Sequence, residues 1–229
     1  MAYGNSFQRT SPVVLNLIII NVIVYFAQTA FAGHADPDRV TDLFALHHYK
    51  SEMFQPYQIV THMFMHGGLF HLLFNMLALW MFGSTVEKVW GPKRFLIFYL
   101  ICGVVAALTQ MGSYVFDWWA IDHTVLSPED MAQYQLILRK TATVGASGAI
   151  MGILAAFGYL FPNTTLFIMP IPVPVKAKWA IMGIIALDVF GGISRVPDDN
   201  IAHFAHVGGA LAGLLIVLYW NKTNKKTFY

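Results

Sequence analysis

Six apolar stretches, separated by more polar connections, run along the 229 residues of the chain. A helix needs about 20 mostly apolar residues to cross a lipid bilayer. The pattern therefore predicts an all-α integral membrane protein, a single domain over residues 1–229 built as a bundle of six transmembrane helices. The predicted spans are residues 12–32, 68–86, 94–115, 142–161, 177–192 and 201–220.

The segment before the fifth stretch is apolar, but its prolines oppose a helix. Pro170, Pro172 and Pro174 occupy every second position, and each removes a backbone amide donor. We expect an extended connector on one face of the membrane. Few basic residues come before the first apolar stretch, and no cleavage site of small residues comes after it. We therefore expect this stretch to be a retained transmembrane span and not a removed signal peptide.

The composition excludes an ordinary soluble domain of this size. Hydrophobic residues make up 57% of the chain and charged residues only 11%, with a mean hydropathy of +0.57. The single cysteine, Cys102, cannot form an internal disulfide, so helix packing must hold the fold together.

The basic residues predict the orientation in the membrane. Because cytoplasmic connections are enriched in Lys and Arg, we expect both termini to be cytoplasmic. The net charge of +2 then reflects orientation, and no basic patch indicates a nucleic-acid partner. Nine of the 14 Lys and Arg residues lie on the termini and on the connections of that side: Arg9, Lys88, Lys93, Arg94, Lys176, Lys178, Lys222, Lys225 and Lys226.

Four polar residues lie at one predicted depth on three spans that enter from the same side. Ser147 and His206 are each about five residues into the fourth and sixth spans, which is about 7–8 Å at 1.5 Å per residue. His71 and Asn75 are three and seven residues into the second span, on one helix face. Polar groups inside a membrane are costly, so such a layer indicates function.

Small residues would let these spans approach closely. Gly148 and Gly152 form a stripe on the fourth span, and Gly209 and Gly213 form another on the sixth. A serine within reach of a histidine base is the minimum for nucleophilic acyl transfer. His71, Asn75 and the backbone amide of the serine would then donate to a tetrahedral oxyanion.

Other roles for these residues compete with catalysis. A membrane serine commonly bonds the carbonyl one turn back, and the histidine and the asparagine could be interhelical packing contacts. A metal site is a further alternative, disfavoured because no carboxylate or thiolate accompanies the histidines at that depth; its candidate ligands are His62, His66, His71, His203 and His206. Asp188 could orient His206, but we expect it to face water near the end of the fifth span.

Three motifs carry a family resemblance. GASG at 145–148, AHVGG at 205–209 and HLLFN at 71–75 together resemble a bacterial rhomboid intramembrane serine protease. The resemblance implies a six-helix bundle with a water-filled cavity open to the outside. It also implies a location in the bacterial cytoplasmic (inner) membrane, the lipid bilayer and transmembrane proteins as partners, and no metal or organic cofactor. The sequence does not specify an oligomeric state.

The resemblance also implies roles for individual residues. Ser147 would be the nucleophile and His206 the general base, as a Ser-His dyad without an acid. His71, Asn75 and the amide of Ser147 would form the oxyanion hole, and Gly145 would belong to the loop that shapes it. The enzyme would cleave transmembrane segments near the outer face; a proteolytically silent relative that binds such segments, or a transporter using the histidine layer, is the alternative.

The chain departs from the family pattern at two places, whose effects the sequence leaves open. Tyr57 and Gln58 stand where many members have Trp-Arg, and Met151 stands where some bacterial members have a tyrosine. The resemblance implies that His66 has a structural role. It also makes the fifth span a lateral gate, and the loop 191–200 would suit a movable cap. The loop 116–140 is long enough for a short helix with Ser127 as its N-cap.

Overall fold

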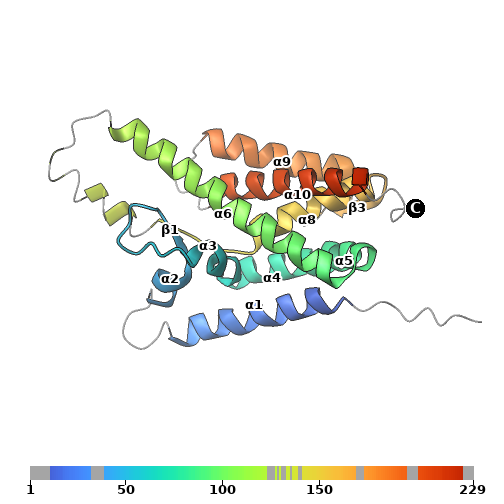
Figure 1. The fold of residues 1–229 in the computed structure, drawn as a ribbon, viewed down its shortest axis with the longest axis horizontal. Coiled ribbons are helices and arrows are strands. Elements are labelled where there is room, and N and C mark those ends of the chain that lie inside the picture. Colours follow the sequence, from blue (N-terminus) through green and yellow to red (C-terminus); the bar gives the residue numbers. More distant parts are fainter. Residues whose placement is uncertain are drawn as a thin grey trace, which may run out of the picture.

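The computed structural model describes residues 11–31, 39–122, 127, 129, 133–134, 136–138, 141–168, 173–194 and 201–223. Within this part of the chain, five helices are long and apolar enough to cross a membrane, and a shorter apolar helix, α8 (Ser147–Leu160), lies among them (Figure 1). The predicted all-α membrane bundle is thereby confirmed. The five are α1 (Pro12–Phe31), the continuous run Leu69–Trp90, α6 (Pro92–Asp122), α9 (Ala177–Ser194) and α10 (His203–Thr223).

The second membrane helix is made of three consecutive parts. These are α4 (Leu69–Ala78), a π-helical turn η2 (Leu79–Gly83) and α5 (Ser84–Trp90). The helix ends four residues later than predicted, because Gly91 with a φ of 80° breaks it and Pro92 starts α6. α6 also continues seven residues beyond its predicted end, since hydropathy marks the apolar part of a helix and not its last residue.

The fourth predicted span is wrong in its first five residues. Ala142–Thr143 form a short strand, β2, that pairs antiparallel with β1 (Leu46–His47), and the helix begins only at Ser147. Gly145, with a φ of 127°, lies in the turn between strand and helix. The 14 residues of α8 span only about 21 Å, less than the hydrocarbon thickness of a bilayer of about 30 Å.

Three short helical elements lie on the connection between α1 and α4. They are α2 (Arg39–Phe44), α3 (Gln58–Thr61) and the 3₁₀ turn η1 (His62–Phe64). The side chain of Gln58 is fully buried beneath this connection. Its carboxamide ties the connection together, so a neutral residue replaces the loop-anchoring guanidinium that the resemblance would place here.

The bonds of Gln58 reach three separate parts of the connection. Its Nε2 donates to the carbonyl oxygens of Asp42, Leu43 and Met53 at 3.2, 3.1 and 2.9 Å. Its Oε1 accepts from the backbone amides of His47 and Gln55 at 3.4 and 3.1 Å. Removing a buried group with several partners costs about 1–3 kcal/mol, because the partners are left unpaired.

Glycines bring α8 against α10, as the sequence predicts. A side-chain carbon at Gly209 would collide with the backbone of Gly148, and one at Gly213 would collide with the backbone of Gly152. The other side of α8 packs on α6, where Gly152 lies against Cys102. Close backbone approach of this kind replaces the hydrophobic effect, which does not act between helices surrounded by lipid.

The two ends of the bundle differ in content. The β1 end holds α2, α3, β1 and the first turns of α4, α8 and α10 (Figure 1). The lysine end holds the first turn of α1, the corner between α5 and α6, the last turn of α10 and the hairpin of β3 (Thr165–Ile168) with β4 (Val173–Lys176). Its lysines are Lys88, Lys93, Lys176, Lys178 and Lys222.

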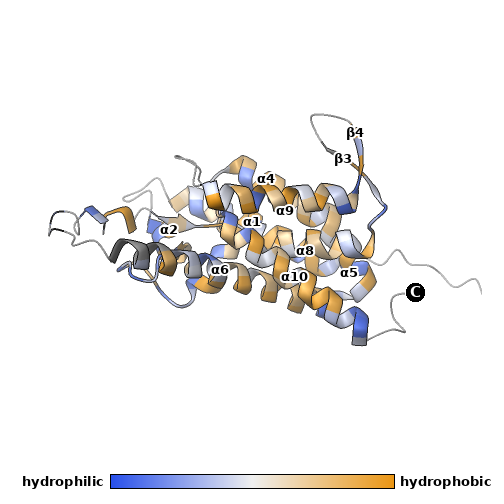
Figure 2. Ribbon diagram, turned by 90° about the horizontal axis from the view of Figure 1, so that it is seen from above, coloured by the Kyte–Doolittle hydropathy of each residue, from blue (hydrophilic) through white to orange (hydrophobic). Residues whose placement is uncertain are grey.

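The hairpin β3–β4 confirms the extended connector, although Pro170 and Pro172 lie outside the described residues. It projects from the apolar bundle in Figure 2. The cytoplasmic location of the lysine end stays a prediction from the positive-inside rule. The short helix expected after Ser127 falls largely outside the described residues. In the loop 191–200, which was expected to form a movable cap, Gly191–Ser194 are instead the last residues of α9, and residues 195–200 are not among the described residues.

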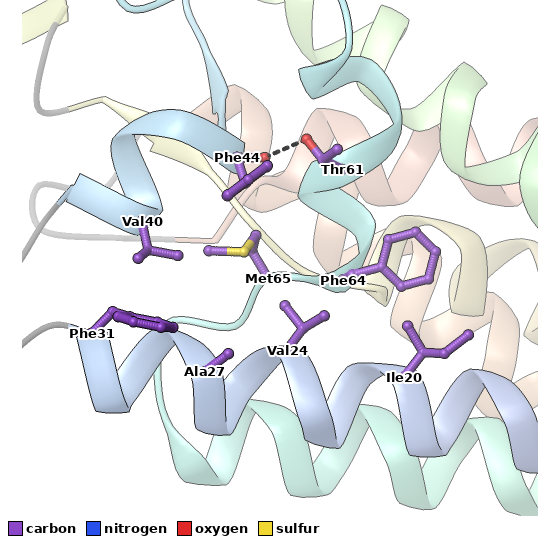
Figure 3. A pocket seen from close by; sticks show the side chains of 9 residues that line it. All are labelled: Ile20, Val24, Ala27, Phe31, Val40, Phe44, Thr61, Phe64 and Met65. Carbon is purple, nitrogen blue, oxygen red and sulfur yellow. Dashed lines mark hydrogen bonds between the residues drawn. The ribbon is translucent and has the colours of Figure 1, made fainter.

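An apolar cavity of about 380 Å³ lies between α1, α2 and η1 (Figure 3). The hydroxyl of Thr61, the polar side chain in its wall, donates to the carbonyl oxygen of Phe44 at 2.7 Å. The wall therefore offers mainly hydrocarbon surface. The cavity is lined by Ile20, Val24, Ala27, Phe31, Val40, Phe44, Thr61, Phe64 and Met65.

Candidate active site

Ser147 and His206 are in direct contact. The Nε2 atom of His206 lies 2.8 Å from the Oγ atom of Ser147, although the two residues are 59 positions apart. Ser147 is the first residue of α8 and His206 the fourth residue of α10, so the glycine contact between these helices brings the two side chains together. The distance suits proton transfer from hydroxyl to imidazole.

Ser147 also occupies the start of a helix. The first backbone amides of a helix have no partner within it, and the helix dipole adds partial positive charge there. Among the described residues, no side chain caps this end of α8. The amide of Ser147 is therefore a backbone donor with no partner inside α8, at the positive end of the helix dipole. Met151, one turn later on α8, is buried in the hydrophobic core between the helices.

His71 lies against the turn that precedes Ser147. Its Nδ1 accepts a hydrogen bond from the amide of Gly67 at 3.4 Å, so in the neutral ring Nε2 carries the proton. A side-chain carbon at Gly145 would lie 2.9 Å from Nε2 of His71 and 3.5 Å from Oγ of Ser147. Only glycine fits between the two, and its φ of 127° also favours glycine.

Asn75 supplies a buried donor one turn after His71. The residue is 7% exposed, and its Nδ2 has no hydrogen-bond partner among the described residues. A buried amide without an acceptor is costly, so native proteins seldom keep one without a reason. An acceptor atom supplied by a bound molecule would satisfy it.

Asp188 corrects a prediction, since it does not face water. It is 7% exposed, and its Oδ1 lies 2.9 Å from Nδ1 of His206 and 2.8 Å from Nδ1 of His203. The sequence did contain a signal for this, because Asp188 is the twelfth of the 18 residues of α9 and thus lies inside the apolar stretch. The described residues contain no group of three or more His, Cys, Asp or Glu arranged to hold a metal ion.

Two further histidines are buried around the site. Nδ1 of His62 donates to the carbonyl oxygen of Gln58 at 3.0 Å. The ring of His66 packs edge to face against the ring of His71, with 5.1 Å between the ring centroids. Burial lowers the pKa of His62 to about 4. Burial, and secondly the charge of His71, lower the pKa of His66 to about 4. Both rings are therefore neutral at neutral pH.

These features define a multi-pass membrane protein with a serine and a histidine in contact at the buried start of a helix. Comparison with known proteins agrees, since the Rhomboid domain model matches residues 53–222. The chain belongs to the rhomboid family.

Named relatives include proteases of this family. The chain is 31% identical over 210 residues to Rhomboid protease AarA of Providencia stuartii, which covers 88% of the chain and 70% of that protein. It is 28% identical over 209 residues to Rhomboid protease GluP of Bacillus subtilis, covering 90% of the chain and 34% of that protein. It is 32% identical over 157 residues to the human mitochondrial Presenilin-associated rhomboid-like protein, and this match covers 68% of the chain and 36% of that protein. The chain thus spans about a third of the length of these last two.

Proposed function

We propose that this rhomboid family member is an intramembrane serine endopeptidase with Ser147 as nucleophile and His206 as general base. The observation that carries the proposal is the contact of 2.8 Å between Oγ of Ser147 and Nε2 of His206 at the start of α8. A serine in a membrane helix that has only a structural role usually donates its hydroxyl proton to a backbone carbonyl of the preceding turn. Ser113 does so, since its Oγ donates to the carbonyl oxygen of Gln110 at 2.7 Å.

The reaction begins when His206 takes the proton of Ser147 and Oγ attacks the carbonyl carbon of the scissile peptide bond. The carbonyl oxygen becomes an oxyanion, which accepts hydrogen bonds from the amide of Ser147, Nε2–H of His71 and Nδ2 of Asn75. His206 then gives its proton to the leaving amine as the C–N bond breaks. Water, deprotonated by His206, hydrolyses the acyl-enzyme and restores the serine.

The substrates proposed are transmembrane segments of other membrane proteins. The peptide bonds of a helix are enclosed by their own hydrogen bonds, so a segment must unwind locally before its carbonyl reaches Ser147. A segment in the bilayer would meet the apolar outer face of α9, where Leu187 and Phe190 are 70% and 69% exposed. The proposed location is the bacterial inner membrane, with the cut near its outer face.

A fluorophosphonate probe tests the proposal directly. The purified protein, in detergent and in liposomes, is treated with the probe, and the adduct is located by mass spectrometry. We expect an adduct on Ser147 that is lost in Ser147→Ala and His206→Ala and retained in the matched control Ser113→Ala. No adduct in folded protein in either environment would favour a proteolytically silent relative that binds transmembrane segments.

A second experiment measures proteolysis itself. The protein is reconstituted with a membrane protein that has helix-breaking residues near the outer end of its transmembrane segment. We expect cleavage within or beside that segment, and loss of cleavage by about 10⁴-fold or more in the serine and histidine variants.

A further inference from the structure

Asp188 is a carboxylate inside an apolar membrane helix. Its neighbours Leu187 and Val189 are 70% and 41% exposed, so the surrounding surface of α9 is hydrocarbon, whereas Asp188 itself is 7% exposed. A charged group at such a position is strongly unfavourable unless hydrogen bonds compensate for the lost water. Its partners must therefore account for its presence.

Those partners are the Nδ1 atoms of two histidines on α10. Oδ1 of Asp188 lies 2.8 Å from Nδ1 of His203 and 2.9 Å from Nδ1 of His206. An ionised carboxylate can only accept hydrogen bonds, so both nitrogens donate. The neutral ring of His206 then carries its proton on Nδ1, and Nε2, 2.8 Å from Oγ of Ser147, is left as the acceptor.

Two glycines that follow Asp188 on α9 allow the close contact with α10 that holds the carboxylate. A side-chain carbon at Gly191 would collide with the ring of His203, and one at Gly192 would crowd the ring of Phe204 and the β-carbon of His203. These glycines let α10 approach α9 closely enough for His203 to reach Asp188. Because His203 and His206 are one helical turn apart, both rings bond the same oxygen and restrict its rotation.

We infer that Asp188 is a positioning residue that holds His206 in the tautomer and orientation needed to accept the proton of Ser147. This inference rests on the proposed serine protease function. It replaces the acid-free dyad implied by the family resemblance with a chain of three groups from α8, α10 and α9. The carboxylate takes no proton in this scheme; it stabilises the imidazolium that forms when Nε2 is protonated.

Asp188→Asn in the full-length protein tests the inference. The amide keeps the size of the carboxyl group but can donate as well as accept, so it no longer selects the Nδ1–H tautomer. We expect kcat for cleavage, and the rate of fluorophosphonate labelling of Ser147, to fall by about 10²–10⁴-fold, while KM changes less than about 3-fold. Glu87→Gln, which neutralises another buried carboxylate far from Ser147, is the matched control and should leave both rates unchanged.

The tautomer of His206 gives a readout that does not require activity. Nitrogen-15 spectra of the histidine rings are recorded in detergent in the Ser147→Ala background, with the His206 signal assigned by its loss in His206→Gln. We expect the proton on Nδ1 in the protein that retains Asp188, and a mixture of tautomers in the Asp188→Asn variant. A proton on Nε2 in the protein with Asp188, or labelling of Asp188→Asn at the unaltered rate, would overturn the inference.

The two experiments separate this inference from the proposed function. If the protein with all its native residues is not labelled, yet His206 holds its proton on Nδ1 and loses this preference in Asp188→Asn, the protease proposal fails and the positioning role of Asp188 stands. If labelling at Ser147 is normal and indifferent to Asp188, the protease proposal stands and the positioning role fails.

Discussion

Two buried carboxylates, one toward each end of the bundle, have different partners and therefore different consequences. Glu87 in α5, near the lysine end, is 2% exposed, and its two oxygens accept from the backbone amides of Val13 and Val14 at 3.0 and 2.8 Å. Asp188 in α9, nearer the β1 end, is 7% exposed and accepts from two histidine rings.

The nature of the partner decides what a buried carboxylate can do. Backbone amides keep their protons, so Glu87 can only fix the first turn of α1, where its negative charge also complements the helix dipole. Imidazoles exchange protons, and one of those bonded to Asp188 touches Ser147. We therefore expect changes near the β1 end to affect the rate of reaction and changes at the lysine end to affect stability alone.

The largest effect expected outside Ser147, His206 and Asp188 is that of Asn75→Ala. It should lower kcat for cleavage by about 10²–10³-fold, because it removes a donor to the oxyanion. Stability in thermal unfolding should change little, since Nδ2 has no partner to lose among the described residues. Asn21→Ala is the matched control: Nδ2 of Asn21 donates to the carbonyl oxygen of Leu17 at 2.7 Å, so stability should fall and the rate should not. A loss of stability without loss of rate in Asn75→Ala would contradict the oxyanion role.

Acid should weaken the β1 end, which carries the buried histidines. Because the pKa of His62 and that of His66 are lowered to about 4 in the folded protein, the unfolded chain binds protons first as the pH falls below about 6.5. The contribution of these two histidines to stability should be constant above that pH and decrease between about pH 6.5 and 4, by up to about 1.4 kcal/mol per pH unit for each histidine.

Thermal unfolding in detergent from pH 8 to pH 4 measures this slope. His62→Gln keeps a donor for the carbonyl oxygen of Gln58 but cannot bind a proton, so the slope should flatten. A variant with the unaltered slope would show that another group causes the acid sensitivity.

Glu87→Gln should lower the free energy of unfolding by about 1–3 kcal/mol, because one of the two amides of α1 loses its acceptor and the other keeps only a neutral one. The rate of labelling per folded molecule should stay the same. Thermal unfolding and labelling of the same preparation test both halves of this expectation, and a reduced rate in fully folded protein would break the contrast between the two carboxylates.

The smallest effects compare two glycines with positive φ. Gly145→Ala and Gly91→Ala should each cost about 1–2 kcal/mol of stability, because both residues would be forced into a strained backbone conformation, φ 127° and φ 80°. No atom of the described residues lies within 4 Å of a side-chain carbon at Gly91, whereas one at Gly145 would press on His71. Only Gly145→Ala should therefore slow labelling of Ser147. Equal rates in the two variants would show that His71 does not act at this site.

Part of the candidate site could be predicted from residue spacing. The small-residue stripes predicted that α8 and α10 meet, and this contact brings His206 to Ser147. The depth argument, however, counted five helical residues before Ser147, and the structure has none, because strand pairing with β1 takes up Ala142 and Thr143. Hydropathy cannot distinguish an apolar strand from an apolar helix turn in so short a segment.

The residue pattern along the chain was enough to locate the apolar segments, the motif residues of the site and the places where helices can approach closely. These depend on composition and on spacing along one chain segment. The tertiary structure alone decided the partners of Asp188 and Gln58, whose side chains bond groups on other segments. Such bonds depend on how each helix is rotated about its axis and where each loop folds back, and the hydrophobic pattern of a nearly uniformly apolar helix records neither.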